Sequence, residues 1–213
     1  ATKPILKMNS TTIPAGSGGG TSSNFGFRMN LSELYLINDA TTTAYSTHGS
    51  AVGILIDGTT TRDFTWDNVE FYKLFAGIHF INSGQMFTGQ WNHLRFKNCY
   101  YGILKEDGGA LTSITGQLSF GSCFHGMRIQ AGVYLSLSVN HDSGGLEGSS
   151  GFGPAGDVPV FVDLDSCEGI SFPYFGVEQN NGVLLRLRAQ SDATIDSFFR
   201  TNSIVTTVWE EDG

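Results

Sequence analysis

Apolar and polar residues alternate along much of this chain, which predicts β-strands with one buried face. Four stretches between residues 53 and 132 show this pattern most clearly: GILID, GIHFI, GILKE and GMRIQ, which begin at Gly53, Gly77, Gly102 and Gly126. Side chains of a strand point alternately to its two faces, so one set in each stretch is expected to be buried. Long runs with the 3.6-residue period of a helix are not present. The pattern therefore predicts an all-β protein.

The four glycines recur at intervals of 24, 25 and 24 residues, and aromatic residues keep step with them. A fixed interval of this size is typical of a solenoid, in which each coil buries its inward residues against the coils above and below. Two short strands per repeat, joined by turns, predict a parallel β-helix with coils of about 24 residues. The aromatic residues six positions before a glycine are Phe71, Phe96 and Phe120, and those two before are Phe75, Tyr100 and Phe124.

The repeat continues beyond residue 132 and is interrupted once. Alternation returns at residues 133–139, 159–164 and 182–188, whereas residues 141–158 are rich in Gly and Ser and predict an inserted loop. We expect residues 1–213 to form a single β-helix domain. Because the ends show no obvious cap and open sheet edges invite pairing, we also expect a segment of a longer protein, or ends covered by other chains.

Composition narrows the classes of partner. The net charge is −8 and the pI is near 4.9, so nucleic acid is a poor partner. No apolar run approaches membrane-spanning length, so membrane insertion is not expected. Cys99 and Cys123 should stack in adjacent coils, and two buried free thiols are favoured over a disulfide bridge. No spacing of His, Cys and Asp resembles a metal site, and no cofactor is expected.

The coils resemble the right-handed, single-stranded parallel β-helices of the pectate-lyase-like superfamily. The resemblance rests on the coil length and the aromatic-x-Gly-Ile punctuation, covers about residues 4–208, and includes no catalytic motif. The Gly-, Thr- and Ser-rich texture is most similar to bacteriophage tailspikes and capsule depolymerases. Such proteins bind bacterial surface polysaccharides, many cleave them by hydrolysis or β-elimination, and they are usually trimeric. The resemblance thus implies a homotrimer in the virion tail or outside the cell that binds carbohydrate during host-cell adhesion.

Strand parity places a set of polar side chains on one outward surface, where an extended glycan could lie. Glycoside hydrolysis needs two carboxylates across the scissile bond, ~6.5–9.5 Å apart in an inverting pair. Glu106 and Asp163 are expected two coils apart in one column and form the favoured catalytic pair. The rival carboxylates are Asp57, Glu147 and Asp165, and the expected substrate-binding residues are Arg128, Gln130, His79, Arg186 and Phe161, the last as an exposed aromatic.

Other interpretations of this surface stay open. A polysaccharide lyase would need a base and a positive charge, for which the available groups are Arg128, Arg186, His79 and His141. Arg186 and Arg188 could instead pair with Asp163 and Asp165, and the outward acids could serve solubility alone. The favoured hypothesis is a tailspike-type glycosidase that depolymerises a surface polysaccharide. The alternative is a non-catalytic receptor-binding or structural segment of a virion fibre or adhesin.

The opposite outward face carries fewer candidates. Glu70 and Arg95 are expected to form a cross-strand ion pair. Trp66 and Trp91 align in adjacent coils, either as a sugar platform, as a subunit contact or, slightly favoured, as partly buried corner residues.

Overall fold

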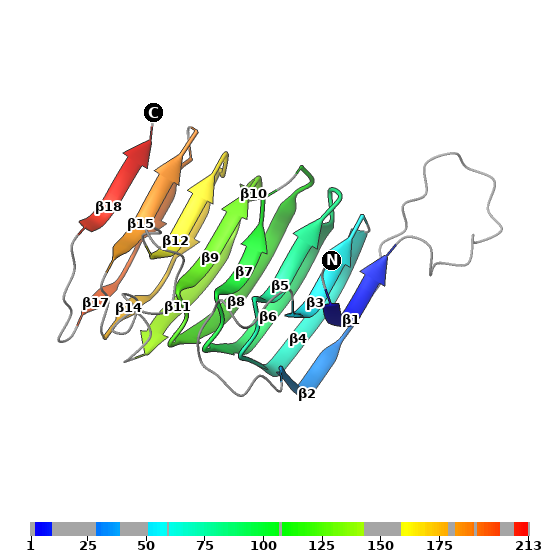
Figure 1. The fold of residues 1–213 in the computed structure, drawn as a ribbon. Helices are drawn as coiled ribbons and strands as arrows, with labels where there is room; N and C mark the ends of the chain where they lie inside the picture. The colour runs from blue at the N-terminus through cyan, green and yellow to red at the C-terminus, as the bar shows by residue number, and fades with distance from the viewer. Residues whose placement is uncertain are drawn as a thin grey trace, which may run out of the picture.

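The computed structural model shows a parallel β-solenoid built from two long sheets (Figure 1). It describes residues 3–9, 29–38, 51–58, 60–106, 108–142, 159–178, 182–189, 191–200 and 207–212. These residues contain strands and turns, and none of them belongs to a helix. They accordingly contain no helix that could cross a membrane.

Sheet 1 has eight parallel strands that follow the order of the coils. Its strands are β1 (Lys3–Asn9), β3 (Ala51–Asp57), β5 (Ala76–Ile81), β7 (Tyr101–Lys105), β9 (His125–Gln130), β12 (Val160–Asp165), β15 (Val183–Arg188) and β18 (Thr207–Asp212). The longer strands of sheet 2 are β2 (Leu31–Ile37), β4 (Thr60–Tyr72), β6 (Gln85–Lys97), β8 (Leu111–Gly121) and β11 (Ser136–Asp142). Its short strands are β10 (Gly132–Val133), β13 (Ile170–Phe172), β14 (Phe175–Val177), β16 (Ala193–Ile195) and β17 (Phe198–Arg200).

The register between strands confirms the predicted fold class and coil length. Val52 pairs with Ala76, and Ala76 with Tyr101, which are offsets of 24 and 25 residues. From β9 to β12 the offset rises to 35 residues, since Met127 pairs with Val162. The lengthened coil is the one that contains the predicted loop at 141–158, of which residues 143–158 lie outside the described part and His141 and Asp142 belong to β11.

The glycine and phenylalanine columns of the sequence meet in the core. Phe71, Phe96 and Phe120 stack with nearly parallel rings, with centroids 4.8 and 5.0 Å apart. Each ring lies against the glycine at the start of its own coil: a Cβ atom on Gly77 would come within 2.5 Å of Phe96, and one on Gly102 within 2.5 Å of Phe120. Only a residue without a side chain allows this approach, which explains why the glycines and aromatics share one interval.

The predicted outward position of Phe161 is wrong. Phe161 is fully buried and packs edge-on against Phe120, with ring centroids 5.4 Å apart. Met127 pairs with Val162, so Phe161 follows Gly126 in the glycine column and not in an outward column. Positions counted from Pro159 are two residues out of register after the inserted loop, because the loop changes the length of its coil.

Two further sequence predictions concern buried residues. Trp66 and Trp91 do stack in adjacent coils, but both are fully buried, so neither can serve as a sugar platform. Cys99 and Cys123 are buried free thiols, as favoured, and donate weak hydrogen bonds to the carbonyl oxygens of Phe71 and Phe96 at 3.7 and 3.3 Å.

The described strands of sheet 2 bend at single residues with left-handed backbone. Asn68 and His93 both have φ near 52°, a conformation that Asn and His adopt more readily than most residues. In β6, three residue steps separate Trp91 from Leu94, whereas the matching residues of β8, Gly116 and Leu118, are two steps apart. The extra residue of β6 makes a β-bulge, and such bulges redirect side chains on a sheet surface. This bulge lies at the candidate site described below.

Candidate functional site

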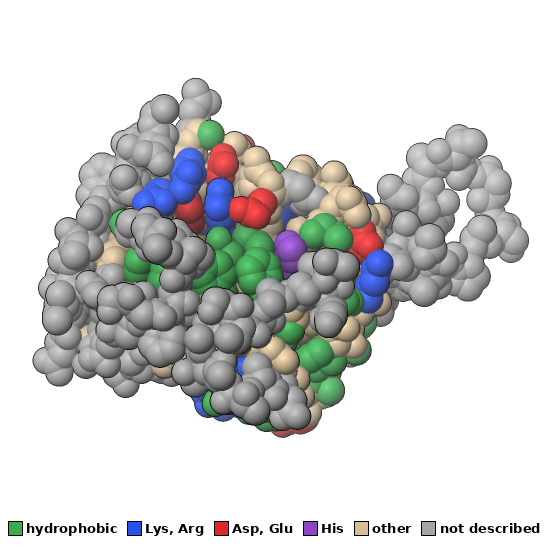
Figure 2. Space-filling view, in the orientation of Figure 1, with side chains coloured by type: hydrophobic (Ala, Val, Ile, Leu, Met, Phe, Trp, Pro, Cys, Tyr) green, Lys and Arg blue, Asp and Glu red, His purple; other side chains and the backbone are tan. Residues whose placement is uncertain are grey.

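The expected charged surface lies on the outer face of sheet 1, but Glu106 and Asp163 are both bound to arginines. Glu106 accepts an ion-pair contact from Arg128 at 2.8 Å, and the same guanidinium lies 3.9 Å from Asp163. Arg188 binds Asp163 bidentately, with Nε and Nη2 at 2.9 and 3.1 Å from its two carboxylate oxygens, and Arg186 lies at 4.0 Å. Figure 2 shows acidic and basic side chains gathered beside a hydrophobic area on this face.

Glu106 and Asp163 do not share a column. Asp163 pairs with Arg128, and Arg128 with Leu104, whereas Glu106 follows Lys105, which pairs with Ile129. The expected column was displaced by two residues for the same reason as Phe161. The structure still brings both carboxylates together, because each contacts the guanidinium of Arg128.

This arrangement is that of an ion-pair cluster. Asp163 is only 5% exposed, and both of its oxygens accept hydrogen bonds from Arg188. A hydrolytic pair needs a glycosidic oxygen and a water between its carboxylates, and here Arg128 contacts both carboxylates. The pairing of Arg186 and Arg188 with Asp163, weighed as an alternative from the sequence, is the one that the structure contains.

The remaining carboxylate candidates also differ from a catalytic pair. Asp57 binds Lys7 at 2.7 Å and accepts a hydrogen bond from Asn82 at 2.6 Å, and these two contacts hold the pKa of Asp57 below its usual value. Asp165 accepts a hydrogen bond from the Ser166 hydroxyl at 2.9 Å. Glu147 lies outside the described residues.

The other expected binding residues are distributed over both sheets. Gln130 pairs with Asp165 across sheet 1. His79 lies edge-on to Phe75, with ring centroids 6.2 Å apart. His141 belongs to β11 of sheet 2, so the structure does not place it beside the arginines of sheet 1.

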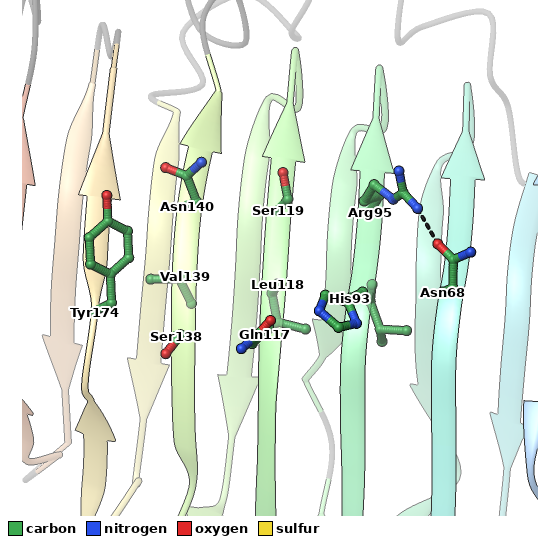
Figure 3. Close-up of a pocket in the computed structure, with 11 residues that line it drawn as sticks. Asn68, His93, Arg95, Gln117, Leu118, Ser119, Ser138, Val139, Asn140 and Tyr174 are labelled. Atoms are coloured by element: carbon green, nitrogen blue, oxygen red, sulfur yellow. Dashed lines mark hydrogen bonds between the residues drawn. The ribbon is translucent and has the colours of Figure 1, made fainter. Parts of the chain in front are cut away.

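A groove with a volume of about 580 Å³ lies instead on the outer face of sheet 2 (Figure 3). It crosses the coils from β4 to the segment before β14, over the strands that flank the β-bulge. Its described lining contains amide, hydroxyl, imidazole, guanidinium and phenol groups, but no carboxylate. The lining residues are Asn68, His93, Leu94, Arg95, Gln117, Leu118, Ser119, Ser138, Val139, Asn140 and Tyr174.

The polar side chains form two rows along the solenoid axis. In one row Arg95 pairs with Ser119, and Ser119 with Asn140. In the other, Gln117 pairs with Ser138, and His93 continues the row on the preceding coil, as Figure 3 shows. Adjacent strands are roughly 4.8 Å apart, so each coil presents one rung of hydrogen-bonding groups, and the rungs recur at a spacing close to the length of one sugar ring.

Tyr174 closes the end of the groove nearer the C-terminus. Its ring fits there because Gly176 has no side chain. A Cβ atom on Gly176 would lie 2.6 Å from the Tyr174 ring, 2.8 Å from its hydroxyl and 2.7 Å from the Asn140 side-chain oxygen. The phenol and the amide therefore share the space above this glycine. Tyr174 remains 37% exposed, so part of the ring is available to a ligand.

The opposite end carries the charged groups of the groove. Asn68 donates a hydrogen bond to Glu33 at 2.5 Å and accepts a short one from Nη2 of Arg95 (Figure 3). His93 contacts Asp67 at 3.3 Å through Nδ1. The expected Glu70–Arg95 ion pair is wrong, although the two residues are cross-strand neighbours, because Glu70 binds Lys97 diagonally at 3.3 Å.

Sequence reasoning placed Arg95 and Ser119 on this face but did not single out the groove. Its signal was a one-residue difference between repeats: Trp91 and Phe96 are five positions apart, whereas Gly116 and Phe120 are four apart. Among the described residues, His, Cys, Asp and Glu form no group of three that could hold a metal ion.

Comparison with known proteins identifies no relative, so the function is inferred from the geometry of the site. No family model, curated protein or solved structure matches this chain.

Proposed function

We propose that this β-solenoid binds an extended bacterial surface polysaccharide in the sheet 2 groove. The observation that carries the proposal is the pair of axial rows of hydrogen-bonding side chains that end at a partly exposed tyrosine. Amides and hydroxyls match the donors and acceptors of sugar hydroxyls. The exposed part of the tyrosine ring can stack on the apolar face of a sugar, while its hydroxyl can form a hydrogen bond.

The biological setting belongs to the same proposal. The coil pattern and its resemblance to bacteriophage tailspikes support a role in host-cell adhesion, in the virion tail or outside the cell. A homotrimer is the assembly that this resemblance favours. Within that setting the chain acts as a receptor-binding segment.

Binding is favoured over depolymerisation on the geometry of both faces. The described lining of the groove has no carboxylate, and a glycosidase of the usual kind needs two. Glu106 and Asp163, the favoured pair from the sequence, share a guanidinium on the other face. The hydrolase and lyase hypotheses therefore become outcomes of the test.

The test measures binding and cleavage of purified capsular and O-antigen polysaccharides by the whole chain and by two tyrosine variants. Tyr174→Ala removes the aromatic end of the groove, and Tyr134→Ala removes an equally large side chain that is 62% exposed and does not line the groove. We expect about tenfold weaker binding for Tyr174→Ala, since a lost aromatic contact costs about 1–2 kcal/mol. Tyr134→Ala should bind as the unaltered chain does.

Cleavage is followed in the same samples through reducing ends and the ultraviolet absorbance of unsaturated uronates. Binding without either signal, weakened by Tyr174→Ala, supports the proposal. Binding that is equally strong in both variants places the ligand elsewhere and refutes it. Release of reducing ends that is lost in Glu106→Gln would restore the hydrolase hypothesis and the sheet 1 surface.

A further inference from the structure

We infer that Arg95 is the specificity-determining residue of the groove and selects polysaccharides that carry a carboxylate on one sugar. The inference rests on the proposed function and adds the class of glycan and its direction in the groove. The acidic sugar lies at the Arg95 end, and the neutral sugars extend along the amide and hydroxyl rows toward Tyr174.

Arg95 differs from the other arginines at the candidate surfaces in having no carboxylate partner among the described residues. Arg128 and Arg188 form ion pairs with Glu106 and Asp163 on sheet 1. The partner of Arg95 is the neutral amide of Asn68. Its cross-strand neighbour Glu70 binds Lys97, so the arginine keeps its charge for a ligand.

The contact with Asn68 positions the guanidinium without neutralising it. Asn68 is itself fixed, because its nitrogen donates to Glu33 and its oxygen accepts from Nη2 of Arg95. A guanidinium carries five N–H donors and can bind a carboxylate bidentately. With one donor directed to Asn68, four remain. Holding the side chain in place before binding reduces the entropy that the complex must lose.

The two ends of the groove differ in charge. Its described charged side chain, Arg95, lies at the end near β4, and the opposite end carries Asn140, Ser138 and Tyr174. The acids beside this charged end have other partners: Asp67 contacts His93, and Glu33 accepts a hydrogen bond from Asn68. A glycan with one carboxylate therefore has one favoured direction along the axis.

The test uses acidic capsular oligosaccharides that contain glucuronate, each paired with its carboxyl-reduced neutral form. Calorimetric titration of the whole chain should show about tenfold tighter binding of the acidic form, the size expected for one charge-assisted contact in an exposed site. Arg95→Gln should bind both forms equally, at the affinity of the neutral form. Arg95→Lys keeps the charge but not the bidentate geometry, and should retain part of the preference.

Asn68→Gly examines the positioning role, because glycine tolerates the left-handed backbone of residue 68 while removing the amide. This variant should weaken binding of the acidic form by a larger factor than binding of the neutral form, which a purely structural defect would not do. Arg62→Gln is the matched control, since this exposed arginine of β4 lies over the Phe87 ring and does not line the groove.

Each result decides the inference. Loss of the acidic preference in Arg95→Gln, with the preference intact in Arg62→Gln, supports it. Glycans that need Tyr174 for binding but show no acidic preference overturn the role of Arg95 and leave the proposed function standing. Equal weakening of acidic and neutral forms in Arg95→Gln also overturns it. Failure of the acidic forms alone overturns the inference, whereas failure of both the acidic and the neutral forms to bind overturns the proposed function as well.

Discussion

A methyl group added at Gly77 tests the contact that produces the repeat. The Cβ of Gly77→Ala would lie 2.5 Å from Cδ1 of Phe96 and 2.8 Å from the carbonyl oxygen of Gly102. Contacts this short force the neighbours to move, and one of them is backbone, which cannot escape by changing rotamer. Overpacking of this kind costs about 1–3 kcal/mol, and the reduced freedom of alanine in the unfolded chain recovers about 0.4–1 kcal/mol. We expect a net loss of about 1–2 kcal/mol.

The matched control is Gly121→Ala. Its Cβ would meet only Cγ of Lys97, at an ordinary 3.6 Å. This substitution should be neutral or stabilise the protein by up to about 1 kcal/mol. Urea unfolding followed by circular dichroism measures both changes. A third variant, Gly77→Ala with Phe96→Leu, should unfold less readily than the sum of the two single changes predicts, because the smaller side chain makes room for the methyl.

Two results would contradict this expectation: equal stability of Gly77→Ala and Gly121→Ala, or additive effects of the changes at residues 77 and 96. Either result would mean that the phenylalanine ring does not occupy the space above the glycine. The shared interval of glycines and aromatics would then need another cause.

Three further predictions concern charged and thiol groups. Asp163→Asn should destabilise the protein by about 2–4 kcal/mol, because it leaves partly buried arginines without their carboxylate. Glu106→Gln should cost less than about 1 kcal/mol, because its ion pair with Arg128 is about half exposed. Urea unfolding of the two variants compares these losses, and equal losses would contradict the difference in burial. The contact with Lys7 lowers the pKa of Asp57, so the ion pair should stabilise the protein above the unfolded pKa of about 3.9 and cease to do so as the pH falls through the lower folded pKa. Asp57→Asn should therefore reduce the loss of unfolding free energy at acid pH. An unchanged dependence of stability on acid pH would contradict this. Burial raises the pKa of Cys167 to about 11, so this thiol should react with a disulfide reagent at pH 8 only after unfolding, and rapid labelling of the native protein would contradict its burial.

The repeat made the fold predictable from the sequence. The glycine interval correctly indicated parallel strands, because in-register stacking places the same type of side chain at the same position of each coil. The alternation correctly indicated the buried side chains Ile54, Ile56, Ile78 and Phe80. Coil length, the two-strand repeat and the free thiols at Cys99 and Cys123 followed from the same columns.

Register beyond the inserted loop was not predictable in this way. Counting positions works only while coils have equal length, and the coil that ends at β12 is longer. Phe161 was therefore assigned to the surface although it is in the core, and Asp163 was placed two positions from its true column. Lys105 illustrates another limit: it occupies an inward position and is fully buried, with its amine donating to the Gly108 carbonyl at 3.1 Å.

The groove could not be located from the sequence because it depends on contacts between coils. A single extra residue at His93, the diagonal pairing of Glu70 with Lys97, and the ring of Tyr174 above Gly176 together shape it. Each of these features depends on which of several residues in the neighbouring strand a side chain contacts, and the alternation of apolar and polar residues does not determine this.

A crystal structure of the whole chain with a bound acidic capsular oligosaccharide would show which of the two sheets holds the ligand. We expect sugar rings in the sheet 2 groove, one per coil between Arg95 and Tyr174, with the carboxylate on the guanidinium of Arg95. Sugar bound on sheet 1 beside Glu106 and Asp163, with the sheet 2 groove empty, would contradict it.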